Sequence, residues 1–280
     1  MAVLLALCSA ALYGTGDFLG GLSSRRAPAL LVVGASQVVG LAVGAVLAVA
    51  LGGNLTAADA GWAAAGGLTG AAGLGLLYRA LADGSMSVVA PVTAVCAAAV
   101  PVFAGLAGGD VVSAPALAGL VLALPAVGMV ARERGEDARL DPRTIAAAVA
   151  AGTLIGAFLV MLDRTSDDSG LWPVVVARSA SSVAVGVLVL ALWWGRHVPP
   201  RLPRPAWVLV TAAGVADMSA NVLYLLAVRE GQLSIVGLLS SLYPVSTVLL
   251  ATLLLRERLS KVQLAGVGGC TVAVLLIASS

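Results

Sequence analysis

The placement of the charged residues is the feature that most constrains how this chain can fold. Of its 280 residues, 30 are Asp, Glu, Lys or Arg, and 27 of these fall into nine short clusters. The clusters lie near Arg25, Asp59, Arg79, Asp110, Arg132–Arg143, Asp163–Asp168, Arg196–Arg204, Arg229 and Arg256–Lys261. They divide the sequence into ten apolar segments, and only Asp17, Arg178 and Asp217 lie inside one.

The lengths of these segments fit a lipid bilayer. A helix that crosses about 30 Å of hydrocarbon needs roughly 20 apolar residues, and uncharged stretches such as 27–58, 84–109 and 231–255 supply them. A membrane-spanning barrel would instead show stretches of about ten residues with alternating polarity. Charged residues make up 11% of the chain, against about 25% in a soluble domain. This composition excludes soluble enzymes, nucleic-acid-binding proteins and disordered chains.

The sequence therefore predicts an all-α polytopic membrane protein with ten transmembrane helices. We expect them at 2–22, 28–51, 60–80, 86–107, 112–131, 144–162, 171–194, 205–227, 232–255 and 261–278.

Other classes of site lack the residues they need. Cys8, Cys96 and Cys270 all lie in apolar segments, which argues against a disulfide framework or a metal cluster. The only lysine, Lys261, has no Gly-rich phosphate loop before it, so we expect no ATP site. We expect no catalytic residues, metal or cofactor, and the net charge of +2 is too small to indicate a nucleic-acid partner.

The two halves of the chain resemble each other. At an offset of 147 residues, Ala80, Gly84, Ser87 and Val89 match Ala227, Gly231, Ser234 and Val236, and Leu117–Gly119 match Leu264–Gly266. At the same offset, Asp110 and Ser113 match Glu257 and Ser260. Pro28 and Trp62 match Pro173 and Trp207 at an offset of 145. The matches keep one order and pair five helices with five, which indicates an internal duplication.

The duplication predicts a domain plan. Residues 1–131 form the first five-helix repeat, 132–143 a charged linker and 144–280 the second repeat. A unit with an odd number of spans leaves its copy inverted in the membrane, and inverted repeats around a site near the midplane are a common transporter architecture.

Several motifs are similar to those of a known family. Tyr13–Phe18, Pro173 with Arg178 five residues later, and Tyr243–Pro244 lie in three expected helices. Leu255–Ser260, which contains Glu257 and Arg258, is followed by Gln263, Gly266 and Gly269. Together they resemble the signatures of EamA-type transporters, in the drug/metabolite transporter superfamily. The signature residues Glu257, Arg258 and Pro244 concern fold and packing.

The resemblance covers both halves and implies a ten-helix secondary transporter that exports or exchanges a small metabolite or drug-like molecule. Its partners would be that substrate and the lipid bilayer, with the chain a monomer or a homodimer. The expected location is the bacterial inner (plasma) membrane.

The three charged residues inside apolar segments are the first candidates for a substrate or proton pathway. An ionisable residue in a helix bundle costs several kcal/mol on insertion scales, about 3 at the helix centre, so it is a functional candidate by default. A carboxylate in a low-dielectric setting binds a proton more readily than one in water. Proton-coupled transport through Asp17 or Asp217 is therefore a hypothesis.

Polar neighbours extend this set. Tyr13 lies one helical turn before Asp17, and Asn221 and Tyr224 follow Asp217 at the spacing of one helix face. Ser240 and Tyr243 are further candidates to line a cavity. Each also has a structural interpretation: Asp17 at the interface, Arg178 reaching toward headgroups, and Asp217 with Asn221 and Tyr224 as interhelical hydrogen bonds.

Two other functions remain open at this stage. Gly14–Asp17 reads as the GxGD string of intramembrane aspartyl proteases, with Asp217 as a conceivable second carboxylate. That alternative leaves the duplication unexplained. The other is a membrane sensor or scaffold that transports nothing.

Orientation and substrate are also open. Thirteen basic residues lie in loops after the odd-numbered helices and two in loops after the even-numbered ones, which places both termini outside by the positive-inside rule. The family resemblance implies cytoplasmic termini instead. Asp17 and Asp217 would suit an amine and Arg178 a carboxylate, so an amino-acid-like metabolite and an amphiphilic drug both fit.

Overall fold

The computed structural model describes residues 1–24, 27–83, 86–130, 142–194, 202, 204–255 and 259–278. Within these residues the chain is helical and contains no strand. The helices are α1 (Ala2–Ser24), α2 (Ala29–Leu51), α3 (Ala57–Asp83), α4 (Met86–Ala107), α5 (Ala114–Val130), α6 (Pro142–Asp163), the 3-10 turn η1 (Asp167–Ser169), α7 (Trp172–Trp193), α8 (Arg204–Glu230), α9 (Leu233–Ser240), α10 (Tyr243–Leu255) and α11 (Lys261–Ala278).

Most of these helices are suited to a membrane. In the described part of the chain, seven are long and apolar enough to cross one, including Leu233–Leu254, which joins α9 and α10. Three shorter apolar helices run over Val92–Ala107, Ala114–Met129 and Lys261–Ile277. The all-α membrane class expected from the charge spacing is confirmed.

The start of α3 lies three residues before the expected position of 60. Thr56 precedes the helix, and its Oγ1 accepts a hydrogen bond from Asp59 N at 3.1 Å. The Asp59 carboxylate in turn accepts one from Thr56 N at 3.1 Å. This reciprocal pair is a capping box, and it fixes the first turn of the helix ahead of the apolar run.

The single helix expected over 232–255 is wrong at its centre. The structure ends α9 at Ser240 and begins α10 at Tyr243. Pro244 has no N–H to donate to the carbonyl of Ser240 one turn earlier, so a regular helix cannot continue through this point. A tighter turn follows, in which Val245 N donates to Leu242 O at 2.9 Å.

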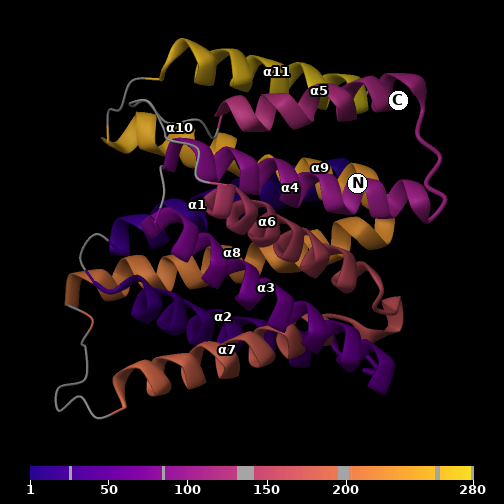
Figure 1. Ribbon diagram of the computed structural model, residues 1–280. Helices are drawn as coiled ribbons and strands as arrows, with labels where there is room; N and C mark the ends of the chain where they lie inside the picture. The colour runs from indigo at the N-terminus through magenta and orange to yellow at the C-terminus, as the bar shows by residue number, and fades with distance from the viewer. Residues whose placement is uncertain are drawn as a thin grey trace.

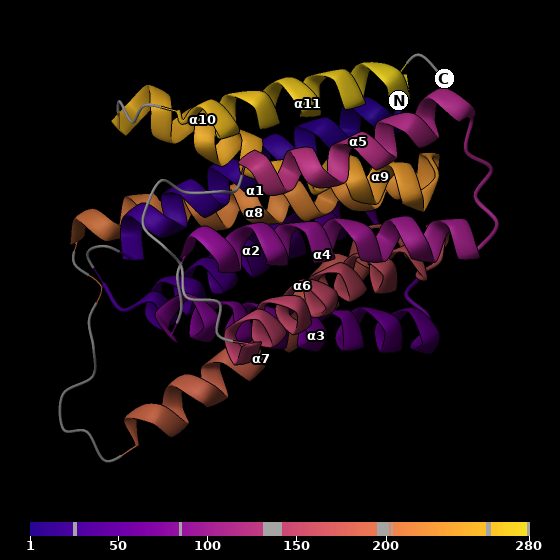
Figure 2. The ribbon, with the colours of Figure 1, turned by 45° about the horizontal axis from the view of Figure 1, so that its top comes forward.

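The contacts between helices come in matched pairs. The contact of α1 with α8 is matched by that of α3 with α6, and the contact of α2 with α8 by that of α3 with α7. The contact of α4 with α6 is matched by that of α1 with α9 and α10. α2 also contacts α7, and α5 contacts α11. In Figure 1, α5 and α11 lie together along the top edge and α2 and α7 along the bottom. Figure 2 again shows α5 beside α11, with α7 at the opposite edge.

Glycines permit two of these matched crossings. A Cβ added at Gly67 of α3 would overlap the backbone carbonyl of Ala177 in α7. A Cβ at Gly214 of α8 would come within 2.5 Å of the carbonyl oxygen of Ser36 in α2. Because no side chain intervenes, the backbones of these helices approach closely, as small residues allow in membrane helix bundles.

Polar bonds join the loops at the end of the bundle where α1 begins and α11 ends, which we call the N-terminal end (Figure 1). The Asp59 carboxylate accepts hydrogen bonds from Ser166 N at 2.7 Å and Ser166 Oγ at 2.9 Å. Arg229 at the end of α8 donates to Ser166 O at 2.9 Å, and Asn54 N donates to Asp168 O at 2.7 Å. These bonds tie the α2–α3 loop, the α6–α7 loop and α8 together.

A second set of bonds joins the α4–α5 loop to α9 at the same end. The Asp110 carboxylate accepts a hydrogen bond from Ser234 N at 2.9 Å, in the first turn of α9. Gln232 Nε2 donates to Val111 O at 2.8 Å. A carboxylate at this position satisfies a free N–H of the helix terminus and interacts favourably with its positive dipole.

Candidate functional site

A cavity of about 200 Å³ lies within the bundle. Among the described residues, its lining draws on every helix except α5 and α11. One side is apolar and comes mainly from α3 and α6, with Leu74, Leu77, Ile155 and Phe158. The polar side chains that line it are Tyr13, Asp17, Gln37, Arg178, Ser181, Asp217, Asn221, Ser240, Ser241 and Tyr243.

The motif Tyr13–Phe18 of α1 places two of these side chains. A Cβ at Gly14 would overlap the backbone carbonyl of Tyr243, and one at Gly16 would lie 3.5 Å from the Cβ of Asp217. The two glycines therefore bring α1 close to both α10 and α8. Tyr13 and Asp17, one helical turn apart on the same face, both reach the cavity.

An ion pair crosses the cavity wall from α7 to α8. The guanidinium of Arg178 donates to the carboxylate of Asp217 and also to Gln37 Oε1 on α2. The side chain of Arg178 is 13% exposed and that of Asp217 is 38% exposed, so the pair is only partly removed from solvent. Ser181 Oγ donates to the same Gln37 oxygen at 3.2 Å.

A second set of hydrogen bonds joins α1 to α8. Tyr13 Oη donates to Asn221 Oδ1 at 2.9 Å, and Asn221 Nδ2 donates to the backbone carbonyl of Asp217 at 2.7 Å. Asn221 is buried, and these bonds satisfy both its acceptor and one of its donors. The polar stripe of α8 is thus bound to the first half of the chain through Tyr13.

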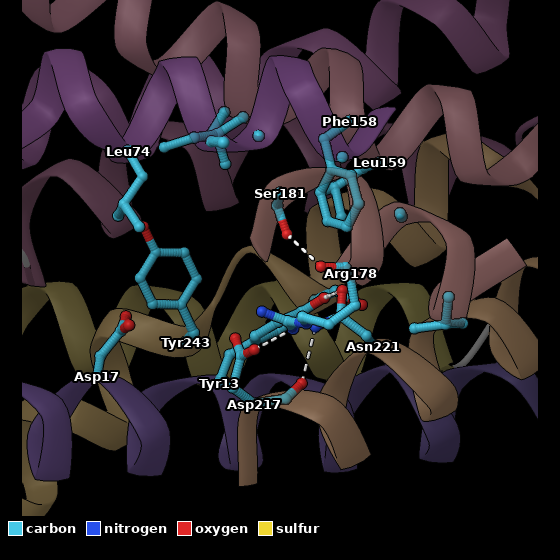
Figure 3. Close-up of a pocket in the computed structure, with 18 of the residues that line it drawn as sticks. Tyr13, Asp17, Leu74, Phe158, Leu159, Arg178, Ser181, Asp217, Asn221 and Tyr243 are labelled. Atoms are coloured by element: carbon cyan, nitrogen blue, oxygen red, sulfur yellow. Dashed lines mark hydrogen bonds and ion pairs between the residues drawn. The ribbon is translucent and has the colours of Figure 1, made fainter. Parts of the chain in front are cut away.

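Asp17 lies apart from the ion pair. In Figure 3 its carboxylate is beside Tyr243, while Arg178 is surrounded by Asp217, Asn221 and Tyr13. No hydrogen bond or ion pair joins the Asp17 carboxylate to another residue of the part of the chain that the structure describes.

The structure brings seven of the eight predicted pathway residues to one cavity: Tyr13, Asp17, Arg178, Asp217, Asn221, Ser240 and Tyr243. Their role in transport stays a prediction. Tyr224 does not line the cavity, because it is fully buried and its hydroxyl donates to Leu159 O at 3.0 Å.

The predicted signature residues fall elsewhere. The backbone of Pro244 belongs to the first turn of α10, just after the break. Glu257 and Arg258 lie outside the described residues.

Gln37 is a polar cavity residue that the sequence reasoning missed. It is 6% exposed and accepts hydrogen bonds from both Arg178 and Ser181. Gln37 carries no charge, so it does not stand out as an ionisable residue in an apolar segment. The sequence did contain a signal for Gln37, which is a polar residue within an apolar helix. It lies one helical turn after Val33, the position that corresponds to Arg178 at an offset of 145 residues. A polar amide on that face of an apolar helix marks a partner for a buried charge.

Comparison with known families identifies the second half of the chain. Residues 142–279 match the model of the EamA-like transporter family. This half is similar to an EamA-like transporter domain. The family belongs to the drug/metabolite transporter superfamily, so the resemblance drawn from the sequence motifs is confirmed. No curated protein sequence matches the chain.

Solved structures share the fold of nearly the whole chain, beyond the part that the family model matches. Twenty-seven chains match. One of them, described only as "Crystal structure of protein", covers 98% of this chain and 98% of its own length at 21% sequence identity, with a TM-score of 0.76. At that identity the likeness shows a common fold alone.

The family and the apolar helices together mark an integral membrane protein with a transporter-like EamA domain. They do not favour the aspartyl protease alternative. In the structure the Asp217 carboxylate is bound by Arg178, whereas a protease dyad would share a proton between two carboxylates. The described residues hold no group of three or more His, Cys, Asp or Glu placed to bind a metal ion.

Proposed function

We propose that this protein is a secondary carrier that exports or exchanges a small metabolite or drug-like molecule by alternating access. Its ten spans would form two inverted five-helix repeats in a bacterial inner membrane, with the chain a monomer or a homodimer. The observation that carries the proposal is a partly polar cavity in the middle of the bundle, lined by both halves of a chain with an EamA-like domain.

The paired contacts support the inverted repeat. If α9 and α10 count as one span, moving five spans along the chain exchanges the α1–α8 contact with the α3–α6 contact, and α2–α8 with α3–α7. The contacts of α2 with α7 and of α5 with α11 map onto themselves. Gly67 and Gly214 are 147 residues apart and make the same kind of close crossing. A two-fold relation between the halves would produce this pattern.

The cavity also sits where a moving interface would need it. Tyr13 and Gln37 of the first half bond to Asn221 and Arg178 of the second. A rocking motion of one half against the other would strain these bonds, so a bound substrate could favour one arrangement over the other through its own contacts.

Proton coupling remains part of the proposal. Asp17 is the first candidate, because it faces the cavity and has no described partner, while Asp217 is held by Arg178. In proteoliposomes, a coupled carrier should accumulate substrate when a pH gradient is imposed, and Asp17→Asn should remove that response. Substrate movement that ignores the gradient in both proteins would reject coupling.

Alternating access can be tested without knowing the substrate. Ala71 lines the cavity and is half-buried, so Ala71→Cys would place a small thiol there after Cys8, Cys96 and Cys270 are replaced by alanine. A membrane-impermeant maleimide is then added to either side of proteoliposomes of known orientation. We expect labelling from both sides, at different rates.

A cross-link provides the matched control. The backbones of Asn54 and Asp168 are hydrogen bonded at the N-terminal end, so a disulfide between cysteines at these positions should hold that end together. The oxidised protein should then be labelled at position 71 from the opposite side only, and reduction should restore labelling from both sides. Labelling that is one-sided before any cross-link is formed would overturn the carrier proposal.

A further inference from the structure

The charges that face the cavity do not cancel. Among the described lining residues, the charged side chains are Asp17, Arg178 and Asp217. Arg178 is occupied by Asp217 and Gln37, so its positive charge is already matched. Asp17 faces the cavity without a partner in the described chain, and it leaves one uncompensated carboxylate there.

The other polar groups of the cavity are largely used by the protein itself. Tyr13, Gln37, Ser181, Asn221 and Ser241 all bond to described protein atoms. A sugar-like molecule with many hydroxyls would compete with these bonds, because groups already paired offer little to a new ligand. The cavity therefore suits few polar contacts rather than many.

Two hydroxyls of the cavity lining remain available to a ligand. Ser240 is 1% exposed, lines the cavity and has no hydrogen-bond partner among the described residues. The hydroxyl of Tyr243 also lacks a described partner, and Tyr243 lies next to Asp17 in Figure 3. A buried hydroxyl without a partner is costly, so a ligand that bonds to Ser240 would recover that free energy.

The two halves supply opposite surfaces at equivalent positions. At an offset of 147 residues, Asp217 and Asn221 of α8 correspond to Gly70 and Leu74 of α3. All four line the cavity. One counterpart helix therefore presents polar groups and the other an apolar surface, to which Phe158 of α6 adds an aromatic ring.

We propose that the cavity binds an organic cation: a protonated amine on an apolar or aromatic body, with its ammonium at Asp17. The body lies against the apolar surface of α3 and α6, and Ser240 and Tyr243 accept or donate one further hydrogen bond. The ring of Tyr243 beside the carboxylate adds a cation–π contribution. The inference rests on the proposed carrier function, whose substrate class it names.

Three probes with the same phenylethyl body test the charge preference. 2-Phenylethylamine is a cation at neutral pH, 2-phenylethanol is its neutral isostere and 3-phenylpropionate is an anion. Binding to the purified full chain in detergent is measured by isothermal titration calorimetry. A hydrogen bond to a charged group contributes about 1.5 kcal/mol or more, so the amine should bind about 10-fold more tightly than the alcohol, and the acid should bind more weakly than either.

The variants assign the preference to one residue. Asp17→Asn should lower amine affinity to about that of the alcohol, and binding of the alcohol to the same variant shows that it is folded. Asp17→Glu should keep the preference. Asp168→Asn removes an equal charge from an exposed loop side chain and should behave as the wild type.

Equal or tighter binding of the acid, no binding of the amine, or an amine preference that survives Asp17→Asn would each overturn the inference. The maleimide experiment at position 71 separates this failure from failure of the carrier proposal. Alternating labelling without amine binding rejects the substrate class alone, whereas one-sided labelling rejects the carrier whatever binds.

Discussion

Asp59 is the residue at which one substitution should most weaken the N-terminal end of the bundle. Its side chain is 3% exposed and accepts four hydrogen bonds, two from Thr56 and two from Ser166. The bonds to Thr56 are local to the start of α3. The bonds to Ser166 join segments 107 residues apart, so they are the ones that hold the α6–α7 loop against α3.

The expected magnitude follows from these two bonds. A hydrogen bond to a charged group contributes about 1.5 to 3 kcal/mol. Asp59→Ala removes both links and leaves the N–H of Ser166 without its acceptor, so the free energy of unfolding should fall by about 3 kcal/mol. Asp59→Asn keeps one acceptor oxygen but places an amide against a donor, and should lower it by about 1.5 kcal/mol.

Chemical unfolding of the purified protein in mixed micelles, followed by tryptophan fluorescence, measures the change. Asp168→Ala is the matched control, because its side chain is exposed and the substitution keeps the backbone carbonyl that accepts from Asn54 N. In a double-mutant cycle, Asp59→Ala and Ser166→Ala should be less than additive, since they share a bond. Equal effects of Asp59→Ala and Asp168→Ala, or full additivity, would refute the proposed role.

Two further substitutions test helix packing and the ion pair. Gly67→Ala should destabilise the protein, because its Cβ would overlap the Ala177 carbonyl. Gly75→Ala on the same helix meets nothing within 4 Å, so it should be neutral or stabilising by up to about 1 kcal/mol. Thermal unfolding compares the two variants. Arg178→Gln should cost about 2 kcal/mol, between the values for exposed and buried pairs. Adding Asp217→Asn should restore part of that loss, and a double variant less stable than Arg178→Gln would reject the ion pair as a source of the cost.

The class of the fold could be predicted because charge is so costly in hydrocarbon that it marks nearly every helix end. The expected 28–51 and 86–107 agree closely with α2 (Ala29–Leu51) and α4 (Met86–Ala107). Hydropathy carries no information on hydrogen bonds inside an apolar run. Hydropathy therefore does not place the break at Ser241–Leu242, and the residue in the sequence that indicates a kink there is Pro244, a helix breaker.

The members of the site could be predicted better than their partners. An ionisable residue in an apolar segment stands out, so Asp17, Arg178 and Asp217 were found. Which carboxylate pairs with Arg178 depends on how α7 and α8 cross, a long-range property that spacing along the chain does not contain. Gln37 also accepts a hydrogen bond from Arg178, and that contact likewise depends on how α2 and α7 pack rather than on spacing along the chain.

The proposed duplication would explain why packing and chemistry follow different rules in this molecule. Two copies would have to form the same helix crossings, and Gly67 and Gly214, 147 residues apart, each allow a close approach to the backbone of a neighbouring helix. The cavity faces no such requirement, because a substrate is not itself two-fold symmetric. Asp217 and Gly70, which are 147 residues apart, both line the cavity, and the cavity has a polar and an apolar side. In a repeat protein of this kind, positions that agree between copies indicate the scaffold, and cavity positions that differ indicate where the ligand is recognised.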